Sequence, residues 1–155
     1  MFKNILAAID GSQPSRHALT VAADLAQQQG ATLTIMTAVP PLPPLVMEDA
    51  TQAYMPEYQE RVRKSHEELL TSTIADLKKS HPGLKTATVL KEGSPARRII
   101  EAAAEQKADL IVLGNRGTGG IATWLLGSVS RQVTDSCTSP VLVVKDQRYC
   151  EKKQP

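Results

Sequence analysis

The chain has 155 residues, 41% of them apolar and 22% charged, with a formal net charge of +2, as in an ordinary globular domain. A nucleic-acid-binding protein would carry a larger basic stripe, and no apolar run approaches the roughly 20 residues needed to cross a bilayer. We therefore expect a cytoplasmic protein without nucleic-acid or membrane partners. Cys137 and Cys150 have no partner at metal-ligand spacing, which argues against a zinc site.

Strand and helix patterns alternate along the chain. Short apolar or β-branched runs predict strands, and stretches with apolar residues at helical spacing predict helices. The expected strands are 4–9, 31–39, 85–91, 109–113 and 140–144, and the expected helices are 13–29, 51–80, one beginning at Pro95, and 128–137. Strict alternation with continuous apolar strands predicts one α/β domain, a doubly wound five-stranded parallel sheet with helices on both faces.

The expected helices also carry buried stripes and terminal signals. We expect Ser12 and Ser94 to cap helix starts and Gly30 to end the first helix. The expected buried stripes are Ala18, Val21, Ala22, Leu25 and Ala26; then Tyr58, Val62, Leu69, Thr73 and Leu77; and then Ala96, Ile99, Ile100, Ala103 and Ala104.

A glycine-rich segment from Gly114 to Ser130 leaves the fourth expected strand and enters a helix at about Ser128. A helix N-terminus offers free amides and a positive dipole end, so it attracts phosphate. Glycines allow the backbone to approach an anion closely, the hydroxyls of Ser128 and Ser130 add donors, and Arg116 adds charge. The segment is not a Walker P-loop, because no Gly-Lys-Ser/Thr ends it, and it matches the dinucleotide fingerprint only weakly.

The spacing of this segment is that of a known family. Gly114, Gly117, Gly127 and Ser128 follow Gly-x2-Gly-x9-Gly-Ser/Thr, so the chain resembles the ATP-binding branch of the universal stress protein family. Further matching segments are 9–12, 92–95, 126–130 and Cys137 with 140–144. The resemblance covers one domain, residues 1–145, and leaves 146–155 as an expected flexible tail. It implies a Rossmann-like fold of the adenine nucleotide alpha hydrolase type, with strand order 3-2-1-4-5.

The resemblance also implies a ligand, ATP or another adenine nucleotide accompanied by Mg²⁺, and a role for each matching residue. Asp10 would lie beside the ribose and help to hold the cation. Ala8 and Val39 would flank the adenine, and Gly114, Arg116 and Gly117 would wrap the ribose and phosphates. The phosphates would receive backbone and hydroxyl donors from Gly127, Ser128, Val129 and Ser130.

The last expected strand carries the interface that we predict. Its residues Val141, Leu142, Val143 and Val144 would lie at a sheet edge, where an apolar strand invites pairing with another copy. The family dimerises there, so the resemblance implies a homodimer as well.

Three functions remain open at this point. The first is a nucleotide-dependent stress-response or signalling module with an unidentified downstream protein partner. The second is a slow ATPase or nucleotide hydrolase, for which Asp10 and Arg116 are the only candidates; no dedicated base is visible, so we expect no enzyme, or weak hydrolysis at most. The third is a dimeric interaction module without nucleotide. Two purely structural alternatives are a mobile glycine-rich surface loop and Asp10 as only a turn residue that caps the first helix.

Overall fold

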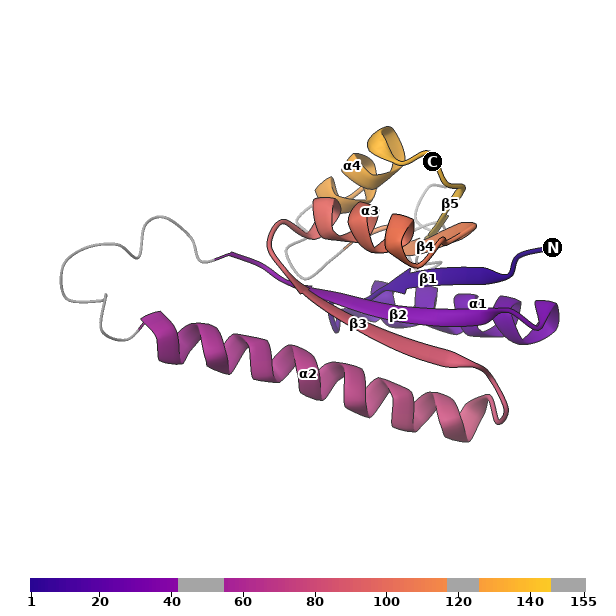
Figure 1. The fold of residues 1–155 in the computed structure, drawn as a ribbon, viewed down its shortest axis with the longest axis horizontal. Helices are drawn as coiled ribbons and strands as arrows, with labels where there is room; N and C mark the ends of the chain where they lie inside the picture. Colours follow the sequence, from indigo (N-terminus) through magenta and orange to yellow (C-terminus); the bar gives the residue numbers. More distant parts are fainter. Residues whose placement is uncertain (42–54, 117–125, 146–155) are drawn as a thin grey trace, which may run out of the picture.

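The structure, a computed structural model, describes residues 1–41, 55–116 and 126–145. Strands and helices alternate through these residues in the predicted order (Figure 1). The elements are β1 (Asn4–Ala8), α1 (Gln13–Gln29), β2 (Thr32–Val39), α2 (Met55–Ser80), β3 (Thr86–Glu92), α3 (Pro95–Glu105), β4 (Leu110–Gly114), α4 (Ser128–Ser136) and β5 (Val141–Val144). Their bounds lie within one or two residues of the sequence predictions, except that residues 51–54 of the second expected helix lie outside the described residues.

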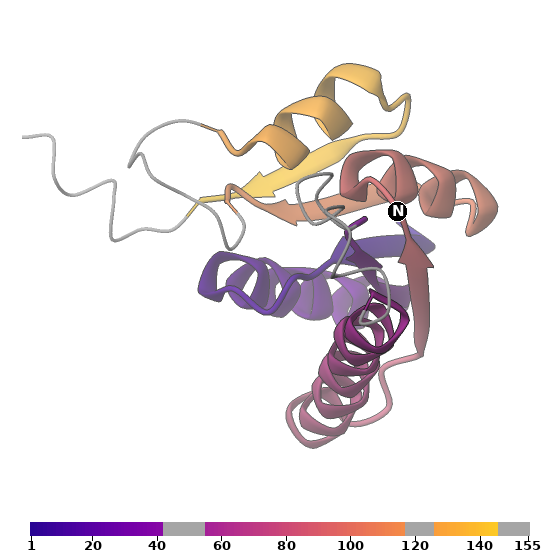
Figure 2. The same cartoon turned by 90° about the vertical axis from the view of Figure 1, so that its left-hand side faces the viewer.

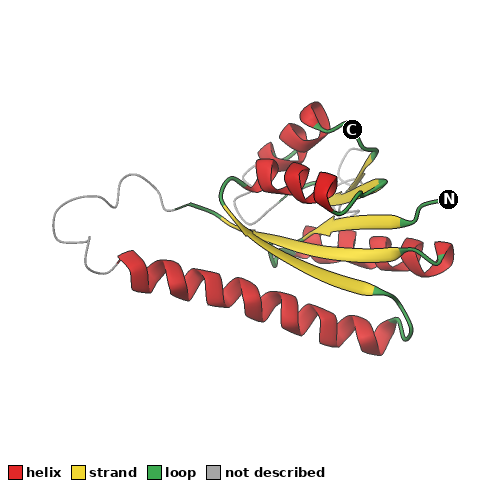
Figure 3. Cartoon of the chain, in the orientation of Figure 1, coloured by secondary structure: helices red, strands yellow, loops and turns green. Residues whose placement is uncertain are grey.

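The strands form one parallel sheet in the order β3-β2-β1-β4-β5 (Figure 3). Ile5 of β1 lies opposite Leu33 of β2 and opposite Leu110 of β4, so β1 is the central strand. All pairs are parallel, which places the carboxyl ends of the strands along one edge. The predicted fold class and strand order are confirmed.

Helices cover both faces of the sheet. Figure 2 shows α1 and α2 on one side and α3 and α4 on the other. Leu33, Ile35 and Val112 pack towards α1 and α2, and Leu6 and Ile111 pack towards α3 and α4. Small residues let helices approach a sheet closely, which explains how a chain poor in aromatic residues builds a dense core. No helix in the described ranges combines the length and apolar character that a membrane span requires.

The two predicted helix caps have different outcomes. The Ser12 hydroxyl accepts a hydrogen bond from the Ser15 amide at 3.3 Å, and Gly30 ends α1 with a φ of 64°. These two predictions are confirmed. Ser94 occupies the N-cap position of α3, but its side chain makes no capping hydrogen bond, so the expected bond is absent there.

Two predicted buried stripes need correction. In α3, Ala104 is exposed and Ala102 is buried instead, because α3 packs against α4 as well as against the sheet. In α2, Tyr58 is 51% exposed. Figure 1 shows the reason, since the first turns of α2 extend past the end of β3 and have no sheet beneath them.

Truncating Leu33 tests the core beneath α1 and α2. This side chain is fully buried, so Leu33→Ala is expected to lower the free energy of unfolding by about 2–5 kcal/mol, through lost burial and the cavity left behind. Leu25→Ala is the matched control, because Leu25 is only partly buried against the same cluster. Urea titrations with unchanged m-values measure both losses, and equal losses would contradict this account of the core.

Candidate functional site

The carboxyl edge of the sheet gathers most of the predicted site residues. Asp10 follows β1 closely, Val39 ends β2 and Gly114 ends β4, while α4 begins at Ser128. In parallel sheets that are doubly wound, ligands bind beyond this edge, where the strand order reverses. The reversal lies between β1 and β4 in this sheet, so the edge is the candidate site.

Gly114 is the point at which three segments meet. An added Cβ would lie 2.8 Å from the Pro14 carbonyl oxygen and 3.0 Å from the Ser15 amide nitrogen. Glycine therefore lets β4 approach the first turn of α1. The buried Ser130 hydroxyl donates to the Gly114 carbonyl oxygen at 2.8 Å. Gly114 thus joins the starts of α1 and α4 to the end of β4, a packing role that is independent of any ligand.

Asn115 holds together the two ends of the loop that follows β4. Its carbonyl oxygen accepts a hydrogen bond from the Gly127 amide at 2.8 Å, and its own amide donates to the Val144 carbonyl at 3.0 Å. An added Cβ at Gly127 would lie 3.2 Å from the Asn115 carbonyl oxygen, so a larger residue there would force the loop ends apart. The side-chain Oδ1 of Asn115 is buried and has no hydrogen-bond partner among the described residues. Sequence reasoning missed this residue, whose only signal is its place beside the first glycine of the motif.

The N-terminus of α4 presents uncapped amides. Its first hydrogen bond joins the Arg131 amide to the Gly127 carbonyl at 2.9 Å, so the amides of residues 128–130 have no acceptor inside the helix. Gly127 is the N-cap, and no side chain in the described ranges caps the helix. Such an end binds anions through its amides and dipole. The Ser128 side chain is exposed. The Ser130 hydroxyl donates to the Gly114 carbonyl oxygen, so the amide of Ser130 is its remaining donor at this helix end.

Asp10 is held in a turn at the start of α1. Its Oδ1 accepts hydrogen bonds from the Ser12 amide at 3.0 Å and the Ser12 hydroxyl at 2.5 Å. Asp10 is therefore a turn residue, as expected, but it does not cap the first helix, because the N-cap of α1 is Ser12. A ligand role is compatible with it, because a carboxylate has about four acceptor positions on two oxygens.

Ala8 and Val39 lie on opposite faces of the sheet. Side chains alternate along a strand, and Ala8 packs against the cluster under α3 and α4. Val39 lies an even number of residues from Leu33 and Ile35 along β2, so its side chain is on the same face as theirs, towards α1 and α2. It is only 2% exposed. The two side chains therefore cannot contact a ligand from the same face of the sheet. Because the Val39 side chain is buried, Val39 could contact a ligand only through its main chain.

The turn after β3 packs against the end of β2. The Gly93 amide donates to the Val39 carbonyl oxygen at 2.9 Å, with a Gly93 φ of 129°. Arg98 of α3 donates from its Nε to the Glu92 carbonyl oxygen at 2.6 Å. The sequence indicates a helix start here, but no pattern singles out Arg98.

A metal site made by protein side chains alone is not present in the described ranges. They contain no group of three His, Cys, Asp or Glu residues that could hold a metal ion. Mg²⁺ at Asp10 would therefore take most of its oxygen ligands from phosphate and water. Arg116 is half-buried after Asn115, and the predicted residue Gly117 lies outside the described residues, as do residues 146–155.

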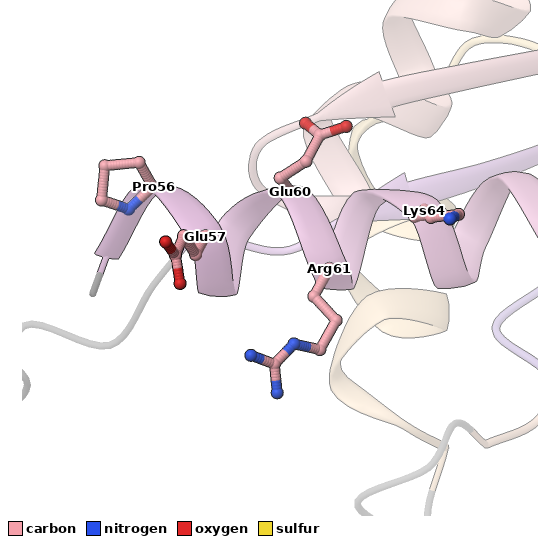
Figure 4. A pocket seen from close by; sticks show the side chains of 5 residues that line it. All are labelled: Pro56, Glu57, Glu60, Arg61 and Lys64. Atoms are coloured by element: carbon pink, nitrogen blue, oxygen red, sulfur yellow. The ribbon is translucent and has the colours of Figure 1, made fainter.

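The described residues also form two surface depressions. One is lined by Pro56, Glu57, Glu60, Arg61 and Lys64, and Figure 4 shows these side chains leaving a single helix in different directions. The other lies between α3 and α4 and is lined by Ser94, Ala96, Arg97, Ile100, Glu101, Gln132 and Ser136. Neither includes a predicted site residue, so the carboxyl edge remains the candidate site.

The edge strand β5 pairs only with β4 in the described sheet. The carbonyl oxygens of Pro140 and Val144 accept hydrogen bonds from Ile111 and Asn115 on that side. Since main-chain groups alternate in direction along a strand, the amides and carbonyls of Val141 and Val143 face the open edge. The side chains of residues 141–144, including Leu142, are half-buried.

Comparison with known proteins agrees with this architecture. The model of the universal stress protein family matches residues 1–145. A universal stress protein in the QAH/OAS sulfhydrylase 3′ region of Thermus aquaticus is 36% identical over 145 residues, which cover 94% of this chain and 100% of that protein. Among solved structures, universal stress protein UspA from Lactobacillus plantarum has a TM-score of 0.75 at 25% identity, covering 92% of this chain and 97% of that one. A universal stress protein in complex with cAMP has a TM-score of 0.62 at 27% identity, with the same coverage of both chains. The chain belongs to the universal stress protein family.

Proposed function

We propose that this chain is a nucleotide-dependent stress-response or signalling module that binds an adenine nucleotide, ATP with Mg²⁺, at the carboxyl edge of the sheet in the cytoplasm. The observation that carries the proposal is the uncapped N-terminus of α4 beside the ends of β1 and β4. Three amides there lack helical acceptors, and Gly127 leaves room for an anion to approach. The relative solved in complex with cAMP supports an adenine nucleotide as the ligand.

The proposed site runs across the strand ends from the base to the phosphates. The base would lie near Ala8 and the main chain of Val39, and the ribose near Asp10, which also reaches the cation. Phosphates would lie at the start of α4. The residues assigned to the ribose and phosphates are Gly114, Arg116, Gly117, Gly127, Ser128, Val129 and Ser130. The bound Mg²⁺ would neutralise phosphate charge, with Asp10 as the one protein carboxylate proposed to reach it.

Binding rather than turnover is the proposed activity. Phosphoryl transfer requires a positioned base or water and charge stabilisation at the transition state. Asp10 is the candidate carboxylate, and it is engaged by Ser12 in the turn before α1. We therefore propose no catalytic residue and weak ATP hydrolysis at most.

We propose a homodimer formed by β5 strands of two copies. The main-chain groups of Val141 and Val143 face the open edge, where a second β5 would extend the sheet. Leu142 and Val144 pack partly against the cluster below α1, so a partner would complete their burial. The downstream protein partner is not identified by these features.

A thermal-shift titration tests nucleotide binding. At about 100 times its dissociation constant, a ligand specific for the folded state adds roughly 2.7 kcal/mol of stability. We expect ATP, ADP or AMP to raise the melting temperature, with Mg²⁺ strengthening the effect of ATP, and GTP to raise it less. No shift with any nucleotide would overturn the proposal and favour a dimeric interaction module.

Three variants separate lost binding from lost stability. Gly127→Val should abolish the shift, because its side chain would meet Asn115. Ser128→Asp should also abolish it through repulsion of phosphate, although its carboxylate at the helix start stabilises the free protein by about 0.3–1 kcal/mol. Gly30→Ala is the control: it has open space around it but a φ of 64°, so it should lower stability and keep the shift.

Asp10→Asn tests the enzymatic alternative. The Asn oxygen still accepts from Ser12, so the turn should persist and nucleotide binding should be largely retained. We expect the purified protein with Mg²⁺ to release phosphate from ATP at a barely detectable rate, and this variant to change it little. Clear turnover that is lost in Asp10→Asn, with binding retained, would identify a slow ATPase instead.

Val143→Pro tests the dimer. Proline removes an amide that faces the open edge and leaves the β4 side of the ladder intact. We expect the wild-type protein to sediment as a dimer and Val143→Pro as a folded monomer. Leu142→Pro is the contrasting variant, since it removes an amide that faces β4 and should destabilise the fold. A wild-type monomer at micromolar concentration would contradict this interface.

A further inference from the structure

Arg98 clamps the turn between β3 and α3 by a short hydrogen bond. Its Nε donates to the Glu92 carbonyl oxygen at 2.6 Å. A bond from a charged donor is stronger than a neutral one and fixes the acceptor more firmly. The acceptor here is the last main-chain carbonyl of β3, directly before Gly93.

The Arg98 guanidinium also packs against Gly93 itself. An added Cβ at Gly93 would lie 2.6 Å from Nε, 3.1 Å from Nη2 and 3.3 Å from Cζ of Arg98. The guanidinium therefore occupies the space that a side chain would fill, and the positive φ of Gly93 favours glycine as well. Glycine and arginine together define the shape of this turn.

Arg98 is in turn held by Glu101. Its Nη1 donates to Oε2 of Glu101 at 2.6 Å, and the two side chains are 35% and 31% exposed. This hydrogen bond, joined by a weaker one from Arg97, outweighs desolvation and holds the pKa of Glu101 below its ordinary value. The carboxylate therefore stays ionised and keeps the guanidinium in place near neutral pH.

The clamped turn contacts the base end of the proposed site. Gly93 donates its amide to the Val39 carbonyl at 2.9 Å. The Val39 side chain is buried, so its main chain is what remains to meet a base. Movement of the Glu92–Gly93 turn would therefore also move the main chain of Val39, which is the segment that would distinguish one base from another.

We propose that Arg98 is a positioning residue that sets base selectivity in the nucleotide site, by holding the Glu92–Gly93 turn against the main chain of Val39. The inference rests on the proposed nucleotide function and deepens it. Selectivity between bases depends on fixed donors and acceptors, because a mismatched polar edge is rejected only when the protein groups cannot adjust. The proposed phosphate end lies at the start of α4, and the side-chain hydrogen bonds found for Arg98 in the described residues go to Glu92 and Glu101 and not to α4.

The neighbouring Arg97 provides a matched control. It donates to the other oxygen of the same carboxylate, Oε1 of Glu101, at 3.0 Å, but its side chain is 77% exposed. Arg97→Met and Arg98→Met therefore remove the same charge and one bond to Glu101 each. Only Arg98→Met also removes the hydrogen bond to the Glu92 carbonyl and the packing against Gly93.

The experiment measures displacement of a fluorescent ATP analogue from the full chain by ATP, GTP and inorganic tripolyphosphate. If the binding-competent population falls to about a tenth, affinity falls about tenfold. We expect Arg98→Met to weaken ATP binding by about this factor, to bring the affinities for ATP and GTP closer together, and to leave tripolyphosphate affinity unchanged. Arg97→Met should behave like the wild-type protein. Arg98→Lys, which keeps a single donor for the Glu92 carbonyl, should recover part of the selectivity and provides a second variant if Arg98→Met folds poorly.

Three results would overturn the inference. Unchanged ATP affinity and selectivity in both Arg98 variants, with a wild-type protein that binds ATP, would leave the proposed function standing and remove the role of Arg98. An equal loss for ATP and tripolyphosphate would show a general destabilisation. A wild-type protein that binds no nucleotide would remove the proposed function and the inference with it.

Discussion

The close approach of β4 to α1 at Gly114 is the constraint on which the candidate site depends. With no Cβ at this position, the end of β4 lies against the first turn of α1, and its carbonyl receives the Ser130 hydroxyl from α4. The next residue, Asn115, bonds to β5 and to Gly127. Two adjacent residues therefore fix the starts of two helices and the ends of two strands. Any side chain at Gly114 would separate these parts, whether or not a ligand is ever bound.

The two ends of the proposed site are held by different kinds of interaction. The phosphate end is made of backbone amides, whose direction is fixed by the helix and costs nothing further to orient. The base end depends on a turn that one side chain holds in place. On this proposal, substitutions of side chains near α3 would change which base is preferred and leave the helix amides at the phosphate end as they are.

Much of the fold could be predicted from the sequence, because alternating apolar strands and capped helices are local patterns. The ends of α1 could be predicted for this reason, from Ser12 and Gly30. Which residues of α2 and α3 are buried was harder to predict. The exposure of Tyr58 and Ala104 depends on where each helix lies relative to the sheet and to α4. That information is not local, and no periodicity contains it.

The site was predictable as a motif but not as a set of contacts. The spacing of Gly114 and Gly127 indicated phosphate, yet the structure adds packing reasons for both glycines. Asn115 was missed because its partners are distant in sequence, and Arg98 because it holds a turn whose shape the sequence does not specify. Ala8 and Val39 were expected to flank the adenine, but the sequence did not indicate that their side chains lie on opposite faces of the sheet.

The two edges of the sheet differ in a way that bears on how large an assembly can grow. β5 is short and uncharged, whereas β3 carries Lys91 and Glu92, which pair with Glu105 and Arg63. Charged residues on an edge strand discourage further strand pairing. If β5 could pair with β3 of the next copy, each addition would leave another free edge and a filament would result. With one edge protected, two copies that meet through β5 use up the remaining edge, and growth stops at a closed pair.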